Sequence, residues 1–189
     1  MKLSTPVTSV IWNGVEHQVA WKPRPQGGFW VDNWISNMQV CEKPIVSLGM
    51  EFASTEQAYQ ANKFIDPVKR LAIQRAGHPS QAKTMVRKWP VETPNWDTHR
   101  LGVMWDICSQ KWTQPKHKAI LLSHAEPICE FSNWKDSFWA VVIKEDGTVV
   151  GGQNYLGRIV ESIREQIILG KPLTRPVELQ TIQQISLLN

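Results

Sequence analysis

The stretch STEQAYQANKF, residues 54–64, predicts a helix around which the rest of the chain can be arranged. Ser54 is a favoured N-cap residue, and Gln57 follows three positions later, which is the spacing of a capping box. The helix is expected to run from about Thr55 to Ile65. It should end there because the next residue, Asp66, precedes a proline and such a residue resists the α conformation.

One side of this helix is expected to be polar. At about 100° per residue, Glu56, Gln60 and Lys63 fall within roughly 60° of one another. The residues expected to face the core from the opposite side are Ala58, Ala61 and Ile65. The polar stripe is either a solvated helix face or the wall of an active site. Glu56 also lies in the first turn, where free backbone N–H groups and the helix dipole favour an anion: its own carboxylate or a ligand phosphate.

The composition is that of an ordinary globular protein in a reducing compartment. Of the 189 residues 42% are hydrophobic and 20% are charged, which suits one domain with a buried core. No apolar run approaches the length of a membrane span and no signal peptide is evident, so we expect a cytoplasmic protein without membrane contact. The three cysteines lack a C-x-x-C pair and are expected to be buried free thiols. The scattered histidines predict no metal site.

Strands are expected on both sides of the helical region. Asn13-Gly14 lies between β-rich segments and predicts a hairpin with strands near residues 8–12 and 15–21. Asp146-Gly147 predicts a second hairpin within residues 138–152.

Further helices are expected to follow the first one. Thr93 with Pro94 predicts an N-cap followed by proline at the first helical position. The expected helices cover about residues 67–77, 78–89, 94–112, 115–125 and 156–169. The predicted fold class is therefore α+β, a single compact helix-rich domain with a small antiparallel sheet.

Three other groups of residues are candidates for chemistry. Trp96, Arg100 and Met104 form one helical stripe, which is either a core face with arginine at its edge or a stacking ring beside a phosphate-gripping guanidinium. Asp136 lies among tryptophans, and it either caps a turn or holds ribose hydroxyls. The segment GGQN before the last helix is weak evidence for phosphate binding.

Charge and tryptophan content indicate the kind of ligand. The net charge of +4 and the isoelectric point near 9.0 mildly favour partners that carry phosphate. Ten tryptophans are the larger departure from average composition. Most are expected in the core, with one or two left as stacking platforms for a planar ligand.

Five blocks occur in a recognisable order between Trp34 and Arg164: WISN, STEQAYQANKF, W…R…M…KW, LL…I.E…D.FW and G.N.LG…IR. In this order they resemble the NADAR superfamily (NAD- and ADP-ribose-associated), which includes N-glycosidases of riboflavin-biosynthesis intermediates. The resemblance implies an N-glycosidase domain at residues 29–169. It leaves an N-terminal hairpin and loop extension at 1–28 and a C-terminal tail or appended helix at 170–189.

The resemblance also implies an activity and a set of site residues. The activity is hydrolysis of the N-glycosidic bond between a ribose and a base or amino-heterocycle, and we expect no cofactor. The implied substrates are small nucleotides such as ribosylamino-pyrimidine phosphates, ADP-ribose-type molecules, or ADP-ribosylated guanine in nucleic acid. The family's functional positions fall on Ser36, Asn37, Glu56, Gln60, Lys63, Trp96, Asp136, Trp139, Gly152, Asn154 and Gly157.

Such a reaction needs stabilised oxocarbenium character at C1 and a group that moves protons. We expect Glu56 to be the acid/base and Asp136 to orient the ribose or share the proton transfer. Lys63 either binds phosphate or attacks C1 and forms a Schiff base with the opened ribose. The expected binding side chains are Trp96 against the base, with Arg100 and Asn154 on phosphate or hydroxyls.

Four positions depart from the family pattern. Gln57 stands where histidine is common, Ala140 where glycine is expected, and Ile35 and Met38 replace aromatic residues. Gln57 and Ala140 are the basis of an alternative, a non-catalytic nucleotide or ADP-ribose binding module. Another alternative is an enzyme that removes ADP-ribose from guanine in DNA, because stacking rings and a positive groove hold single strands.

Overall fold

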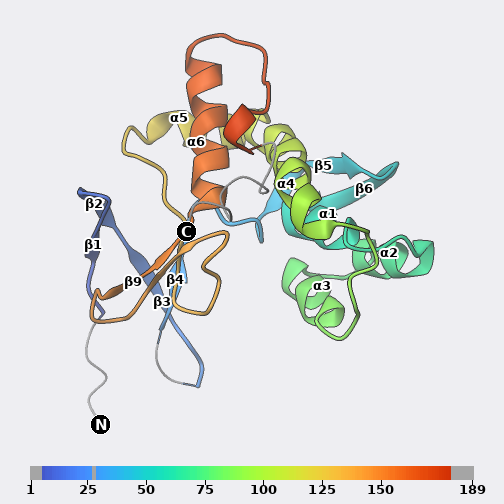
Figure 1. Cartoon of the computed structure of the whole chain (residues 1–189), viewed down its shortest axis with the longest axis horizontal. Coiled ribbons are helices and arrows are strands. Elements are labelled where there is room, and N and C mark those ends of the chain that lie inside the picture. The colour runs from blue at the N-terminus through green and yellow to red at the C-terminus, as the bar shows by residue number, and fades with distance from the viewer. Residues whose placement is uncertain (1–5, 27–28, 180–189) are drawn as a thin grey trace. The chain divides into compact units, whose positions relative to one another are not determined.

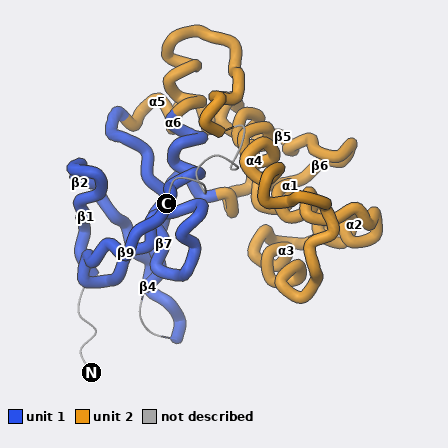
Figure 2. Tube along the Cα trace, in the orientation of Figure 1, with its two compact units in different colours: residues 1–36, 125–161 blue, residues 37–124, 162–189 orange. Residues whose placement is uncertain are grey.

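The computed structural model describes residues 6–26 and 29–179, which fall into two compact units (Figure 1 and Figure 2). Unit 1 draws its described residues from Met1–Ser36 and Ala125–Glu161, and unit 2 from Asn37–His124 and Ser162–Asn189. Each unit is therefore made of two separate stretches of chain. Helix α6, Tyr155–Ile168, begins in unit 1 and ends in unit 2.

The α+β class is confirmed. Within the described part of the chain, strands β1 to β6 precede the consecutive helices α1 to α5, and strands β7 to β9 precede α6. The strands pair in four small sheets, three of which are two-stranded and antiparallel. The fourth sheet has the order β7-β8-β9 and is mixed, because β7 pairs with β8 in parallel.

Unit 1 is built mainly from strands. They are β1 Ser9–Trp12, β2 Val15–Gln18, β3 Ala20–Pro23, β4 Phe29–Asp32, β7 Phe131–Ser132, β8 Val141–Ile143 and β9 Val149–Gly152. Both expected hairpins are confirmed, since β1 pairs with β2 and β8 with β9 in antiparallel fashion. Asn13 and Gly14 take the positive φ angles of 49° and 78° that a tight turn demands. The buried core consists of Val10, Val19, Val31, Phe131, Val141 and Ile143.

Unit 2 is built mainly from helices. Its elements are β5 Val40–Ser47, β6 Met50–Ser54, α1 Thr55–Ala61, α2 Pro67–Gln74, α3 Pro79–Val86, α4 Trp96–Trp112, α5 Pro115–Ser123, the end of α6 and a 3-10 turn at Val177–Leu179. Prolines at the first turns of α2, α3 and α5 explain why these helices begin where the sequence predicts.

Helix α1 has the expected start but ends early. Ser54 Oγ accepts a hydrogen bond from Gln57 N at 3.2 Å, so the N-cap is confirmed. The helix ends at Ala61 instead of Ile65. Lys63 N and Phe64 N donate to carbonyls only three residues back, and Ile65 N and Asp66 N donate to Glu92 Oε2 at 3.0 Å. The prediction that Ile65 faces the core was therefore wrong, and its side chain is 62% exposed.

Helix α4 begins two residues later than Pro94. Thr93 does not act as its N-cap, because its N–H donates to Lys63 O at 3.0 Å and its hydroxyl donates to Asn62 O at 2.7 Å. Asn95, in the left-handed region with φ 50°, precedes the first helical residue, Trp96. Thr93 thus ties the start of α4 to the end of α1.

Cysteines and tryptophans are less buried than expected. All three cysteines are free, but only Cys108 is fully buried, while Cys41 and Cys129 are half-buried. Burial and the neighbouring Glu130 raise the pKa of Cys129 to about 12, so this thiol stays protonated. Of the ten tryptophans three are buried, namely Trp96, Trp105 and Trp112, while the half-buried Trp12 and Trp21 pack against the core of unit 1.

Two remaining expectations concern the membrane and the chain ends. No helix in residues 6–26 and 29–179 is long and apolar enough to cross a membrane. The tail or appended helix was expected at 170–189, and residues 180–189 of it lie outside the described residues. The proposed boundaries after residues 28 and 169 stay predictions.

Candidate active site

Helix α1 is buried along its whole length. All residues from Thr55 to Ala61 are buried, and Glu56 and Gln60 expose only 6% and 3% of their surface. The polar stripe therefore does not form a solvated helix face. A buried carboxylate must be compensated by nearby donors or cations, so its surroundings decide what it can do.

Asn37 holds the N-terminus of α1. Its backbone carbonyl accepts from Glu56 N at 3.0 Å, and its side-chain Oδ1 accepts from the Thr55 hydroxyl at 2.9 Å. With Gln57 N bound to Ser54 Oγ, the amides of both residue 56 and residue 57 are occupied. Free N–H groups that would attract a ligand phosphate, as the sequence suggested, are thus absent at these two positions. Asn37 is a positioning residue for Glu56.

The Glu56 carboxylate is held through one of its oxygens. Oε1 accepts a hydrogen bond from Gln60 Nε2 at 2.8 Å and lies 3.8 Å from Lys83 Nζ. In the described part of the chain, Oε2 receives no hydrogen bond, and the buried Gln60 Oε1 has no donor either. The pair therefore presents two oxygen acceptors to a substrate or a water molecule.

Lys83 is a site residue that the sequence did not reveal. It lies on α3, outside the motif that carries Glu56, and only the packing of α3 against α1 brings it close. Its side chain is 31% exposed, so it joins the buried carboxylate to the protein surface. The predicted Lys63 has its Nζ 5.0 Å from the centre of the Tyr59 ring.

Trp96 lies beside the same helix. Its ring centre is 5.2 Å from that of Tyr59, and its exposed fraction is 9%. Arg100 is one turn further along α4, where its Nη1 lies 3.4 Å from Asp97 Oδ1. Met104 is buried, and its sulfur accepts from Asn37 Nδ2 at 3.3 Å. The stripe on α4 thus runs from an aromatic pair to the residue that anchors α1.

The remaining predicted residues lie in unit 1, where several of them bond to the backbone. Ser36 is half-buried and donates its N–H to Asn33 O at 3.2 Å. Asp136 Oδ1 accepts from Trp139 N at 3.2 Å, so this carboxylate caps a turn. The residues of this turn also bond to the start of α6, because Tyr155 N and Leu156 N donate to the carbonyls of Phe138 and Trp139. Phosphate binding by these two amides is therefore blocked.

The glycine-asparagine block also serves the fold of unit 1. A Cβ on Gly152, where φ is 154°, would lie 2.1 Å from Ala140 O, and a Cβ on Gly157 would lie 2.3 Å from Asn154 Oδ1. Asn154 accepts from Glu130 N at 2.9 Å and donates to Ile128 O at 3.0 Å, so both ends of its amide are bound to backbone. Close backbone approach explains these residues without a ligand.

Three of the departures from the family pattern have local explanations. Ile35 is fully buried and Ala140 is 2% exposed, so both belong to the packing of unit 1. Gln57 points away from Glu56, since its Nε2 donates to the carbonyls of Ile73, Gln74 and Ala76 at 3.2, 3.3 and 3.1 Å. Gln57 therefore fastens the C-terminal end of α2 to α1. We have no structural account of Met38.

Replacing Gln57 tests this structural role. Gln57→Glu removes the donor and sets a carboxylate against three carbonyl oxygens, so we expect the free energy of unfolding to fall by about 2–3 kcal/mol. Urea unfolding followed by tryptophan fluorescence measures the loss. Gln81→Glu, at an exposed position on α3, is the matched control. Unchanged stability with lost ligand binding would instead place Gln57 in the site.

Most of the chain matches known proteins. The family model described as the NADAR domain matches residues 20–168. The chain belongs to the NADAR family. Among curated relatives of this NADAR chain, N-glycosidase YbiA of Escherichia coli strain K12 is 30% identical over 131 residues, which are 68% of this chain and 78% of YbiA. Riboflavin biosynthesis protein VVA0006 of Vibrio vulnificus is 31% identical over 137 residues.

The NADAR chain covers a different share of each relative's length. The match covers 71% of this chain but only 35% of the Vibrio protein, so the chain spans about a third of that relative. The NMR structure of the E. coli protein YbiA is similar with a TM-score of 0.60 at 27% identity, covering 76% of this chain and 82% of YbiA. The family match over residues 20–168 includes part of both stretches of each unit.

Proposed function

We propose that this NADAR chain is an N-glycosidase that hydrolyses the bond between ribose C1 and a ring or amino nitrogen. The main support for this proposal is the buried Glu56 carboxylate. Gln60 and Lys83 both contact its Oε1, and Oε2 remains available as an acceptor. The names of its relatives support the class of reaction, because YbiA is called an N-glycosidase. The substrate is a ribose phosphate or ADP-ribose joined to a base or amino-heterocycle.

Glu56 fits the role of general base. As the C1–N bond breaks, positive charge develops at C1 and the leaving nitrogen takes up a proton. A water molecule bonds to C1 and gives a proton to Oε2 of Glu56. The protonated carboxyl group then gives this proton to the leaving nitrogen, so the products are the free sugar and the N–H base, and the carboxylate is restored. Gln60 and Lys83 fix the orientation of the carboxylate, because both approach the same oxygen.

Two lysines are candidates for a covalent route. In that route a lysine nitrogen bonds to C1 as the base leaves, the ribose ring opens to an iminium ion, and water hydrolyses the iminium ion to restore the amine. Lys83 is within 3.8 Å of Glu56 Oε1, whereas Lys63 lies over Tyr59. We therefore assign the covalent role, where it is used, to Lys83, and a phosphate-binding role to Lys63.

The binding-module alternative loses one of its two arguments. Gln57 has a structural function at the end of α2, so its difference from histidine is no sign of a decayed catalytic site. Asp136 supports proton transfer less well than the sequence suggested, because its Oδ1 caps a turn. The proposal therefore rests on Glu56, with Asp136 kept as a candidate for orienting ribose.

Product analysis by mass spectrometry tests the proposal. The full chain is incubated in parallel with a ribosylamino-pyrimidine 5′-phosphate and with DNA that carries ADP-ribose on guanine. We expect release of ribose 5-phosphate from the first or of ADP-ribose from the second. The absence of both products, with calorimetry showing ADP-ribose bound intact, would establish the binding module instead.

The same reaction mixtures distinguish the lysines. Borohydride reduction during turnover fixes any imine to the protein, and peptide mass mapping then locates the modified residue. We expect the adduct on Lys83, and none on the exposed Lys88, which serves as the control. An adduct on Lys63 would reverse the two assignments, and turnover without any adduct would leave direct attack by water as the route.

A further inference from the structure

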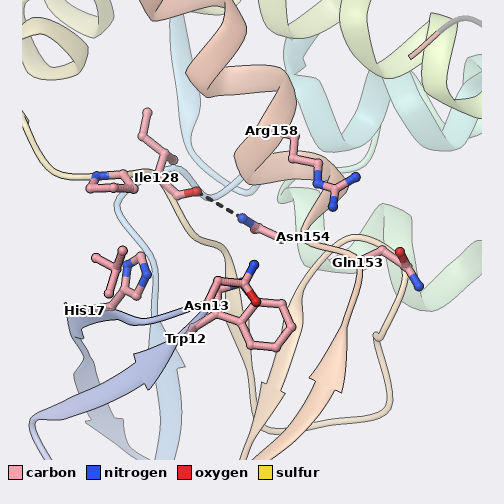
Figure 3. A pocket seen from close by; sticks show the side chains of 9 residues that line it. Trp12, Asn13, His17, Ile128, Gln153, Asn154 and Arg158 are labelled. Carbon is pink, nitrogen blue, oxygen red and sulfur yellow. Dashed lines mark hydrogen bonds between the residues drawn. The ribbon is translucent and has the colours of Figure 1, made fainter. Parts of the chain in front are cut away.

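Unit 1 contains a cavity that is separate from the residues around Glu56. It has a volume of about 180 Å³ and lies between the β1–β2 hairpin and the start of α6 (Figure 3). Trp12, Asn13 and His17 line it from the hairpin, and Gln153 and Arg158 line it from the other side. The family match begins only at residue 20, so the hairpin wall lies outside the shared domain. The cavity is therefore a feature that family membership does not explain.

The walls of this cavity are held in place by the protein itself. Asn154 forms part of the lining, and its amide is tied to Ile128 O and Glu130 N, as the dashed line to Ile128 in Figure 3 shows in part. The opposite wall is a two-stranded hairpin with Trp12 paired to Val15. A preformed site avoids the entropic cost of ordering its walls on binding.

The charge of the cavity selects an anion. Arg158 supplies the positive charge, and its guanidinium carbon lies 5.4 Å from the centre of the Tyr155 ring. Within residues 6–26 and 29–179 no carboxylate forms an ion pair with Arg158, and the lining contains no acidic residue. Burial lowers the pKa of His17, so its imidazole is neutral near pH 7 and adds no second charge. The cavity therefore suits a ligand with one anionic group, which would pair with Arg158.

The shape of the cavity selects a single flat ring. The half-buried indole of Trp12 and the apolar side chains of Pro127 and Ile128 line it. Asn13 and Gln153 are exposed, and their side-chain amides have no hydrogen-bond partner in the described part of the chain. Both side chains can therefore bond to the edge of a heterocycle. A cavity of about 150 Å³ holds benzene, so this one fits one six-membered ring with a small substituent.

We infer that this cavity binds a planar single-ring heterocycle bearing a carboxylate. The ring lies against Trp12, the carboxylate pairs with the Arg158 guanidinium, and the polar edge of the ring meets the amides of Asn13 and Gln153. Guanidinium is well suited to this contact because it binds carboxylate through two parallel hydrogen bonds. This site is independent of the proposed reaction at Glu56.

Isothermal titration calorimetry of the full chain with three matched probes tests the inference. Nicotinate carries the ring nitrogen and the charge, nicotinamide keeps the ring without the charge, and benzoate keeps the charge without the ring nitrogen. We expect nicotinate to bind at least about tenfold more tightly than either analogue. Arg158→Gln should reduce its affinity to that of nicotinamide, and Trp12→Ala should weaken all three probes.

Control variants separate local binding from loss of fold. Arg87→Gln changes an exposed arginine in unit 2 and should leave the affinity unchanged, as should Glu56→Gln. Arg158→Lys keeps the positive charge and should retain part of the affinity, and circular dichroism checks each variant for folding. The inference is overturned by the absence of saturable nicotinate binding up to about 10 mM. It is equally overturned by folded Arg158→Gln protein that binds nicotinate as the parent does.

Discussion

Glu56→Gln should lower kcat/KM for the glycosidic substrate by about 10²–10⁴-fold while leaving the protein folded, because that range is typical of a general base. The amide has the same shape as the carboxylate and its oxygen can still accept from Gln60 Nε2, which now does so at 2.8 Å. The variant loses the negatively charged carboxylate, which accepts the proton of water and whose Oε1 lies 3.8 Å from Lys83 Nζ. Steady-state kinetics with the substrate identified by product analysis give the value.

The matched control for this variant is Glu51→Gln. Glu51 lies on β6, directly before the segment that leads into α1, and its side chain is exposed. The same chemical change there should leave kcat/KM unaltered. Full activity of Glu56→Gln protein would refute the assignment of Glu56 as base, whatever substrate is used.

Gly152→Ala should reduce the free energy of unfolding by about 3 kcal/mol, through overpacking against a backbone that cannot move aside. The added Cβ would lie 2.1 Å from Ala140 O and 2.8 Å from Val141 Cα, and the φ of 154° is itself rare for residues other than glycine. Because β9 pairs with β8 at this point, relief would require opening the sheet. Urea unfolding followed by fluorescence measures the change.

Gly77→Ala is the comparison for this effect. Gly77 has no positive φ, and a Cβ there would meet only the end of the Gln81 side chain, at 3.4 Å. We expect a change within about 0.5 kcal/mol for this surface position. If Gly152→Ala protein kept its stability but lost substrate affinity, the glycine would return to the binding role that the family resemblance implied.

Local signals were sufficient to predict most elements of the fold. The Asn13-Gly14 turn, the Ser54 cap and the prolines that begin α2, α3 and α5 are each set by a few neighbouring residues. Where the predictions failed, a distant residue decided the outcome. Glu92 accepts a hydrogen bond from the amide of residue 65, which was expected in α1, and Thr93 bonds to residues 62 and 63 instead of capping α4.

The candidate site shows the same division. Glu56 and Gln60 are one helical turn apart, so their pairing was visible in the sequence. Lys83 was not, since it lies on another helix and no spacing rule connects it to Glu56. Asn154 bonds to backbone through both ends of its side-chain amide, and in a sequence such an asparagine looks like one that binds a ligand. Its binding role stays a prediction. Helix periodicity gives neighbours along one helix but not across two.

The interleaving of the two units affects how the chain must be made on the ribosome. Residues 37–124 are translated before the second stretch of unit 1, residues 125–161, becomes available to the first. At usual rates of synthesis this interval is on the order of 10 s. During it, the early β-hairpins expose strand edges and apolar side chains such as Val10, Val19 and Val31, whose partners Phe131, Val141 and Ile143 are not yet made. The core of unit 1 can therefore close only after translation has passed residue 161.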